Sequence, residues 1–268
     1  MKELPNSFGQ RRNIQLTKTE KQQRPLKDPL LDPGGPHLDD DFLALCGERN
    51  RRIVKRLKAE EETKRLVEAQ QLYRKEHPLI GVLAIQGNYA SHSQALIEAG
   101  AEPVEVRKPG GLAGLDGLVL PGGESTTILK FLEKHRFFEA LQEFCGRKPI
   151  FGTCAGVILL AREVRNPAQR SLGVLDAVVE RNAYGRQIDS TILTAETALA
   201  GGPLEMVFIR APRIVETGAG VEVLARREGF PVLVCQGRVM AATFHPELSA
   251  DRRVHRLFVE TVAAAHTK

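Results

Sequence analysis

The chain has 268 residues, of which 42% are hydrophobic and 26% are charged, and its formal net charge is +5. This composition is that of an ordinary globular protein, and no stretch approaches the roughly 18 consecutive apolar residues that a bilayer span requires. The opening residues, MKELPNSFGQRRN, contain no apolar signal core, and acidic residues recur from Glu3 onward. We therefore expect a cytoplasmic protein without secretory or transit signals and without a membrane partner.

The excess positive charge lies near the N-terminus. Residues 1–78 hold 17 Lys and Arg against 13 Asp and Glu, whereas the remaining 190 residues hold 21 against 20. Because the larger part is nearly neutral, no stripe of cations is expected to follow a phosphate backbone, which argues against a nucleic-acid partner. The four cysteines form no CxxC pair, so free thiols are expected, with neither disulfides nor a metal site. They are Cys46, Cys145, Cys154 and Cys235.

Residues 1–78 are predicted to form an N-terminal extension, and residues 79–268 the main domain. Residues 1–38 are polar and rich in Pro and Gln, and they bury too little apolar surface to be ordered. Residues 39–76 begin with three aspartates and contain no Pro, which predicts a helix. Its apolar stripe is irregular, which leaves two interpretations open: a solvated appendage, or an arm that docks on a partner subunit.

Strands and helices alternate from residue 79 onward. Such alternation implies right-handed crossovers and a mainly parallel sheet that is covered on both faces. Strands are predicted at residues 80–85, 103–106, 117–120 and 149–152, and helices at residues 91–100, 126–135 and 138–145. Later segments rich in strand-forming residues suggest an antiparallel extension; they are residues 177–181, 206–210, 221–226, 231–236 and 239–244. Residues 252–264 are predicted to form a closing helix.

Cys154 lies between a predicted strand and an apolar helical run. Small residues surround it, at Gly152, Ala155 and Gly156, as a sharp strand-to-helix turn requires. A helix N-terminus favours the thiolate, and the N–H of Ala155 is placed to donate to an oxyanion. The alternative is a buried structural cysteine, but the small neighbours favour a nucleophile.

A thiolate needs a partner that can protonate a leaving amine. His245 follows the predicted strand at residues 239–244 and therefore lies at a carboxyl end of the sheet, as Cys154 does. In an extended backbone Glu247 would point to the same side as His245 and could hold its tautomer. The alternative is an ordinary surface loop.

Residues 121–126, Pro-Gly-Gly-Glu-Ser-Thr, end another predicted strand and open a helix. Adjacent glycines let backbone N–H groups approach a ligand or an oxyanion. The loop is not a Walker loop, because the Gly-Lys-Ser/Thr ending is absent. Its alternative is an ordinary turn, with Ser125 as the helix N-cap.

Together these motifs resemble the glutaminase subunits of pyridoxal 5′-phosphate synthase, a branch of the class I (triad) glutamine amidotransferases. The resemblance covers residues 79–265, whereas family members begin near Ile80, so it assigns no role to residues 1–78. Six segments carry it in order: IGVLAIQG (80–87), LPGGESTT (120–127), FGTCAG (151–156), RNAYGRQ (181–187), FIRAP (208–212) and FHPE (244–247).

The resemblance implies a flavodoxin-like α/β three-layer sandwich with a mostly parallel central sheet, preceded here by a mostly helical or disordered extension. It implies hydrolysis of L-glutamine to L-glutamate and ammonia, with no cofactor and no metal. The ammonia would pass through a tunnel to a lyase subunit, which makes pyridoxal 5′-phosphate from ribose 5-phosphate and glyceraldehyde 3-phosphate.

The resemblance also assigns residues. Cys154, His245 and Glu247 would form the catalytic triad, and the backbone of Gly123 and Ala155 the oxyanion hole. Gln86 would switch that loop when the partner docks, and His92 would lie near the interface. Arg181 suits the α-carboxylate of glutamine. The full set expected to bind glutamine is Gly123, Glu124, Ser125, Arg181, Ile209 and Arg210.

Three other interpretations of the function stay open at this point. The domain could donate ammonia to a different synthase, although the GGESTT, RNAYGRQ and FIRAP strings favour the subfamily above. It could be a stand-alone cysteine hydrolase or thiol chaperone, which leaves the pairing of His245 with Glu247 unexplained. It could be a non-enzymatic subunit, although all three triad residues are present.

Overall fold

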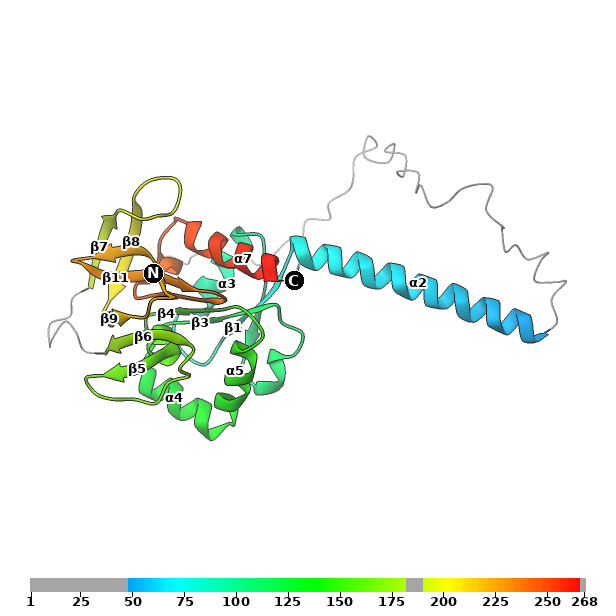
Figure 1. Cartoon of the computed structure of the whole chain (residues 1–268), viewed down its shortest axis with the longest axis horizontal. Coiled ribbons are helices and arrows are strands. Elements are labelled where there is room, and N and C mark those ends of the chain that lie inside the picture. Colours follow the sequence, from blue (N-terminus) through cyan, green and yellow to red (C-terminus); the bar gives the residue numbers. More distant parts are fainter. Residues whose placement is uncertain (1–47, 182–189, 266–268) are drawn as a thin grey trace, which may run out of the picture. The chain divides into compact units, whose positions relative to one another are not determined.

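A computed structural model describes residues 48–181 and 190–265 of the chain (Figure 1). The chain divides into two units, Met1–Thr63 and Lys64–Lys268. Residues 1–47, including the segment expected to be disordered and the start of the expected helix, lie outside the described residues. Helix α2 (Glu48–Glu76) contains neither Gly nor Pro. Its apolar side chains Leu57 and Leu66 are exposed in this chain, whereas near its end Arg74 pairs with Asp116 at 3.0 Å.

A seven-stranded sheet forms the centre of the second unit. Its strand order is β10-β11-β12-β4-β3-β1-β2, and the five strands from β12 to β2 run parallel. The antiparallel strands β10 and β11 form one edge. The strands are β1 (Leu79–Leu83), β2 (Glu102–Val106), β3 (Gly117–Leu120), β4 (Ile150–Thr153), β10 (Glu222–Arg227), β11 (Phe230–Gln236) and β12 (Val239–Ala242).

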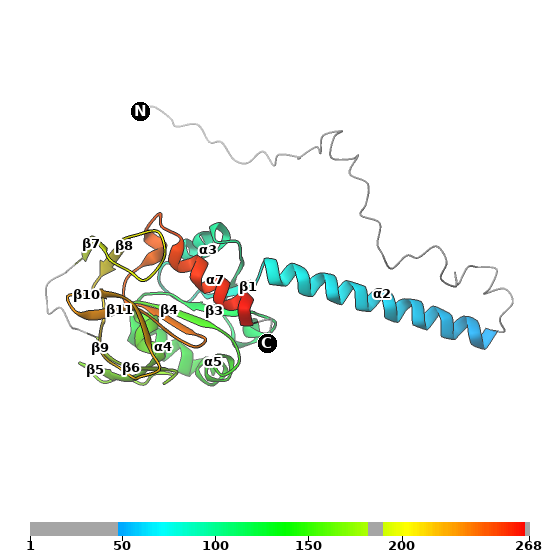
Figure 2. The same cartoon turned by 45° about the horizontal axis from the view of Figure 1, so that its top comes forward.

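Helices cover both faces of this sheet (Figure 2). Successive residues of β3 point to opposite faces, so Leu118 and Leu120 pack with α4 and α5, whereas Val119 packs with α3 and α7. Each face therefore has its own apolar core, and the predicted three-layer α/β sandwich is confirmed. The helices are α3 (Tyr89–Glu98), α4 (Ser125–Lys134), α5 (Phe137–Cys145), α6 (Ala155–Leu160) and α7 (Arg253–Ala265), with the short η2 (Pro109–Leu112) beside α5.

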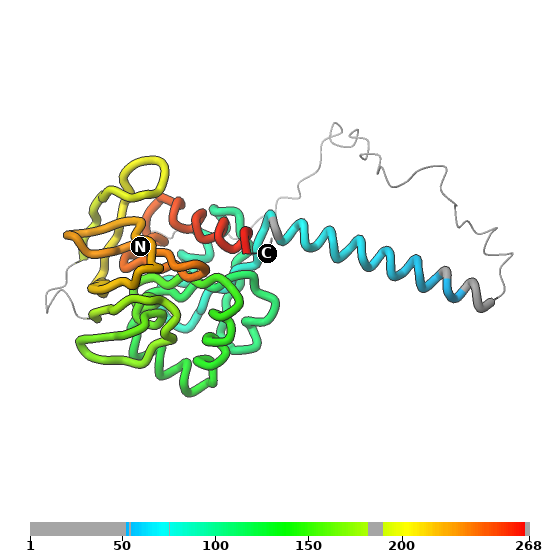
Figure 3. The backbone as a smooth tube through the Cα atoms, in the orientation of Figure 1, coloured from blue at the N-terminus to red at the C-terminus, as the bar shows by residue number. Residues whose placement is uncertain are grey.

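After α6 the chain leaves the central sheet, forms two small sheets and returns through β10 (Figure 3). One small sheet contains β5 (Ala161–Arg165), β6 (Leu175–Glu180) and β9 (Arg213–Thr217), and the other contains β7 (Ser190–Ala195) and β8 (Leu204–Ile209). The predicted antiparallel pairing is confirmed for β10 with β11, and β6 and β8 also have antiparallel partners, β9 and β7, but in the two small sheets. Strand β12 is internal, antiparallel to β11 and parallel to β4.

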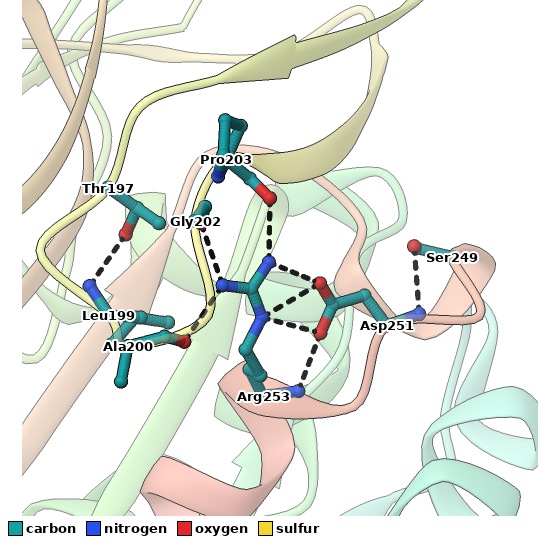
Figure 4. A network of polar contacts seen from close by, with 8 residues as sticks. All are labelled: Thr197, Leu199, Ala200, Gly202, Pro203, Ser249, Asp251 and Arg253. Carbon is teal, nitrogen blue, oxygen red and sulfur yellow. Dashed lines mark hydrogen bonds and ion pairs between the residues drawn. The ribbon is translucent and has the colours of Figure 1, made fainter.

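An arginine clamp fixes the loop that leads into β8 (Figure 4). The guanidinium of Arg253, in the first turn of α7, donates to the carbonyl oxygens of Ala200 (2.9 Å), Gly202 (2.7 Å) and Pro203 (2.7 Å). The same guanidinium pairs with Asp251 at 2.6 Å. Strand β8 starts directly after Pro203, and its far end, Ile209, lines the site described next.

Candidate active site

A cavity of about 370 Å³ lies at the carboxyl ends of the parallel strands. Parallel α/β sheets bind ligands at this edge. Cys154 and His245 line the cavity, as do all six residues predicted to bind glutamine, together with Gln86 and Ala155. The structure therefore brings the sequence-predicted residues into one place, with Glu247 behind His245.

Cys154 occupies a strained turn between β4 and α6. Its φ is +49°, in a region that favours glycine, so neighbouring packing must hold it there. A Cβ added at Gly156 would lie 2.2 Å from the carbonyl oxygen of Leu120, and one at Gly152 would lie 2.7 Å from the backbone of Gly156. Gly156 therefore lets the turn approach β3, and Gly152 lets β4 approach the start of α6. The Cys154 thiol points at the carbonyl oxygen of Ile209, 3.9 Å away.

His245 and Glu247 form a buried pair just after β12. His245 Nδ1 and Glu247 Oε1 are 2.8 Å apart, and the two side chains are 7% and 0% exposed. They meet across a short 3-10 turn, η3 (Pro246–Leu248), and not along an extended strand as the sequence suggested. The backbone N–H of His245 donates to Val207 of β8 (2.8 Å), which places the ring at the cavity.

Charge interactions outweigh burial at this pair. Burial alone lowers the pKa of His245, but hydrogen bonds with the Cys154 thiol and with Glu247 raise it to about 10. Burial raises the pKa of Glu247, but His92 and the hydrogen bond with His245 lower it to about 2. At neutral pH the carboxylate is therefore charged and favours an imidazolium beside the thiol. This is the arrangement that a cysteine nucleophile needs.

The glycine loop after β3 packs directly on this pair. A Cβ added at Gly122 would lie 2.6 Å from the His245 ring and 3.3 Å from Cys154 Cβ. Gly123 has a φ of +138°, which side-chain-bearing residues rarely adopt. The backbone N–H of Glu124 donates to Gln86 Oε1 (3.2 Å), so Gln86 contacts the loop that the resemblance expects it to switch.

Glu124, and not Ser125, caps helix α4. Its carboxylate accepts from the N–H groups of Thr126 (3.1 Å) and Thr127 (2.6 Å) and from the Thr127 hydroxyl (2.7 Å). Burial raises the pKa of Glu124, but these hydrogen bonds lower it to about 2. Ser125 is instead buried and donates to Gln169 Oε1 at 3.0 Å.

Arg181 lies at the end of β6 and reaches the start of α4. Its Nη2 donates to Thr126 Oγ1 (2.7 Å) and lies 3.5 Å from Glu124 Oε1. The Thr126 hydroxyl and the Glu124 carboxylate thus hold the Arg181 guanidinium at the rim of the cavity. The rest of the predicted RNAYGRQ segment, residues 182–187, lies outside the described residues.

Sequence reasoning missed the surroundings of Glu247. The expectation that His92 lies near an interface stays a prediction, and within this chain its side chain is fully buried. His92 Nε2 lies 3.2 Å from Glu247 Oε2, and Asn88 Nδ2 donates to Glu247 Oε1 at 3.4 Å. A signal was present in the sequence, since His92 shares the i, i+3, i+4 face of α3 with the buried Ala95 and Leu96.

Within residues 48–181 and 190–265, no group of three or more His, Cys, Asp or Glu side chains is placed to hold a metal ion. The described helices also include none long and apolar enough to cross a membrane.

Comparison with known proteins identifies relatives of the whole main domain. The sequence profile of the SNO glutamine amidotransferase family matches residues 82–264. The chain is 61% identical to "Pyridoxal 5'-phosphate synthase subunit PdxT" of Koribacter versatilis over 183 residues, which are 68% of this chain and 95% of that protein. It is 51% identical to the protein of the same name from Thermotoga maritima over 185 residues, 68% of this chain and 98% of that protein.

A solved structure, described as a glutamine amidotransferase, is 48% identical and superposes with a TM-score of 0.64, covering 68% of this chain and 98% of that one. The region matched by the family profile contains every residue that lines the cavity.

Proposed function

Because the chain belongs to the SNO glutamine amidotransferase family, we propose that it is the glutaminase subunit of a pyridoxal 5′-phosphate synthase and that Cys154, His245 and Glu247 hydrolyse its glutamine. The enzyme converts L-glutamine and water to L-glutamate and ammonia. The observation that carries the assignment is that Cys154 and His245 line one cavity, with the His245 ring held by the buried Glu247 at 2.8 Å.

The reaction begins when the Cys154 thiolate attacks the carboxamide carbon of glutamine. The carbonyl π electrons move to oxygen, and the N–H groups of Gly123 and Ala155 would stabilise this oxyanion, each by roughly 3 kcal/mol. His245 then gives its proton to the nitrogen, and ammonia leaves as the γ-glutamyl thioester forms. The neutral imidazole next takes a proton from water, whose oxygen attacks the thioester. Collapse of this second intermediate releases glutamate and regenerates the thiolate–imidazolium pair.

The charges at the cavity rim suit a zwitterionic substrate. Arg181 provides a planar guanidinium for the α-carboxylate, and the ionised Glu124 provides a negative charge for the α-ammonium group. The Ile209 carbonyl oxygen lies 3.9 Å from the Cys154 sulfur and would accept from the carboxamide NH₂. Gly123, Ser125 and Arg210 complete the proposed glutamine site.

The proposed partner is the lyase subunit of pyridoxal 5′-phosphate synthase, which would receive the ammonia through a tunnel. That subunit would combine it with ribose 5-phosphate and glyceraldehyde 3-phosphate. Gln86 contacts the Gly123–Glu124 loop and is proposed to change its conformation when the lyase docks. We propose a cytoplasmic location, no cofactor, and neither a nucleic-acid nor a membrane partner.

The decisive experiment measures ammonia release from L-glutamine by the full chain, with and without the purified lyase subunit. We expect strong stimulation by the lyase and, in the complex, label from glutamine amide ¹⁵N in pyridoxal 5′-phosphate. Partner-independent turnover would instead favour a stand-alone hydrolase, and no turnover in either case would favour a non-enzymatic subunit. Activation only by another synthase would favour a different amidotransferase branch.

The matched variant for this experiment is Cys154→Ala. It should remove glutaminase activity while leaving thermal unfolding and lyase binding close to those of the wild type. Normal turnover in Cys154→Ala would contradict the assignment of the nucleophile.

A further inference from the structure

Gln169 contacts the glutamine site from a loop outside the six segments that carry the family resemblance. The loop joins β5 to β6, and Gln169 Oε1 accepts a hydrogen bond from Ser125 Oγ at 3.0 Å. Ser125 lines the cavity and is only 4% exposed, whereas Gln169 does not line it. A side chain that holds a site residue from behind is placed to fix how that residue meets a ligand.

Arg170, the next residue, holds this loop against α4 and α5. Its guanidinium stacks over the ring of Phe138 in α5, 3.8 Å from the ring centroid, and pairs with Glu133 of α4 at 3.2 Å. Stacking and charge pairing of this kind restrain the backbone beside them. The Gln169 amide is therefore presented to Ser125 from an anchored segment.

The contact with Gln169 decides what the Ser125 hydroxyl can offer to a substrate. A hydroxyl has one hydrogen and two lone pairs, and here Gln169 Oε1 takes the hydrogen. For a ligand the hydroxyl can then only accept a hydrogen bond, which suits an ammonium group and opposes a carboxylate. The Gln169 amide nitrogen is buried without a hydrogen-bond partner among the described residues. Because an unpaired buried donor is unfavourable for the fold, the arrangement favours a role in the site.

Ser125 lies between the two charged side chains proposed to bind the α-groups of glutamine. The ionised Glu124 precedes it directly. Arg181 Nη2 donates to the hydroxyl of Thr126, the residue that follows it, at 2.7 Å. An acceptor next to Glu124 adds to the negative part of the site, so the α-ammonium is the group of glutamine that the Ser125 oxygen fits.

We propose that Gln169 is a positioning residue for substrate recognition: by taking the Ser125 hydroxyl hydrogen, it leaves an oxygen lone pair for the α-ammonium group of the substrate. The proposal rests on the proposed glutaminase function and deepens it, because it states which amides the site selects. They are α-amino acids with a side-chain carboxamide, and an amide without the α-ammonium group gains nothing from this contact.

The first test replaces Gln169 by Met, which keeps the length but removes the acceptor, and by Glu, which keeps an acceptor. Hydrolysis of L-glutamine is measured with the full chain in complex with the lyase subunit. We expect Gln169→Met to raise KM about 10-fold with little change in kcat, as expected for a lost hydrogen bond to a charged group. Gln169→Glu should keep KM close to that of the wild type. An unchanged KM in Gln169→Met, or an equal rise in both variants, would overturn the proposal.

The matched control is Gln142→Met, the same substitution at an exposed position of α5, which should leave KM unchanged. A substrate analogue then separates recognition from a general loosening of the loop. 4-Carbamoylbutanoate is glutamine without its α-ammonium group. Gln169→Met should lower kcat/KM for glutamine about 10-fold and leave kcat/KM for the analogue as it is in the wild type. An equal loss with both substrates would show a merely structural role and refute the proposal.

A binding measurement keeps this inference separate from the proposed function. L-Glutamine is titrated calorimetrically into the lyase complex of Cys154→Ala, and into that of the same chain carrying Gln169→Met as well. We expect about 10-fold weaker binding in the double variant, whether or not the wild type hydrolyses glutamine. Equal Kd values would overturn the inference and leave the proposed function standing. Glutamine binding to a wild type that releases no ammonia would refute only the function, and absence of binding to Cys154→Ala would refute both.

Discussion

The α-carbon of Gly156 packs so closely against the Leu120 carbonyl that an added Cβ would lie 2.2 Å from the oxygen. Neither atom belongs to a flexible side chain, so the clash cannot be relieved without moving β3 or the Cys154 turn. This contact links the cysteine turn to the strand that carries the glycine loop.

Gly156→Ala should therefore destabilise the domain by at least about 2 kcal/mol, as overpacking against rigid neighbours does. It should also lower kcat, because the displaced turn carries Cys154. The matched control is Gly146→Ala, since Gly146 has a helical φ of −67° and its added Cβ meets only ordinary contacts, 3.5 Å or more away. Urea unfolding measures both variants, and equal stabilities would contradict the argument.

Glu124→Ala should remove the cap of α4. Loss of a capping side chain costs about 1 kcal/mol, and the freed loop should also bind glutamine more weakly, raising KM. Glu139→Ala is the control, because Glu139 lies in the first turn of α5 and its side chain is exposed. If Glu124→Ala changes neither the free energy of unfolding nor KM, the cap has no role in ordering the loop.

Arg253→Ala should loosen the segment between β7 and β8. Its guanidinium holds three carbonyl oxygens and Asp251 (Figure 4), and hydrogen bonds to charged groups contribute about 1.5–3 kcal/mol each. We expect a lower Tm together with faster amide exchange at residues 197–209. Arg256→Ala, an exposed change on the same helix, should leave both unchanged. Unaltered exchange in Arg253→Ala would show that the clamp does not hold the loop.

Acid should destabilise the fold through three buried groups whose folded pKa values lie below their unfolded ones. His92 and His255 resist protonation down to about pH 4 and 3, although unfolded histidines accept protons below about 6.5. Glu247 stays ionised to about pH 2, and its contribution is present above about 4.5 and lost below it. Each group binds more protons when unfolded, so the free energy of unfolding falls as pH drops from 6.5 toward 3.

His92→Leu removes one of these groups and should flatten the fall between pH 6.5 and 4. The His92 shift from 6.5 to about 4 corresponds to about 3 kcal/mol over that range, as an order of magnitude. Urea titrations at a series of pH values measure it. An unchanged slope in His92→Leu would show that His92 does not remain neutral in the folded state.

The sequence predicted the position of Cys154 and His245 because parallel strands place their carboxyl ends at one edge, whatever their order in the chain. It could not predict that β12 pairs with β4, since four buried residues, VMAA, suit an internal parallel strand or an edge equally. Strands β5 and β9 were missed because their alternating charges, as in AREVR and RIVET, are typical of surface loops too.

One local alternative, Ser125 as the N-cap, is wrong for a geometric reason, and one contact was not foreseen. Ser125 is the more usual capping residue, but the backbone of Glu124 adopts the extended φ and ψ of an N-cap (−93°, 110°), so its longer side chain turns back onto the helix. Likewise, the contact of His92 with Glu247 depends on how α3 packs over the carboxyl end of β12, which spacing along the chain does not reveal.

The pairing of β12 with β4 brings the two catalytic side chains together, so the active site forms only when β12 has joined the sheet. The Cys154 N–H donates to the carbonyl oxygen of Ala242, the last residue of β12, at 2.9 Å, and His245 follows three residues later. A chain in which β12 has not yet inserted therefore lacks both the strand beside Cys154 and the placement of His245 that follows it. The nucleophile and its base are therefore brought together only by the last strand of the sheet in chain order.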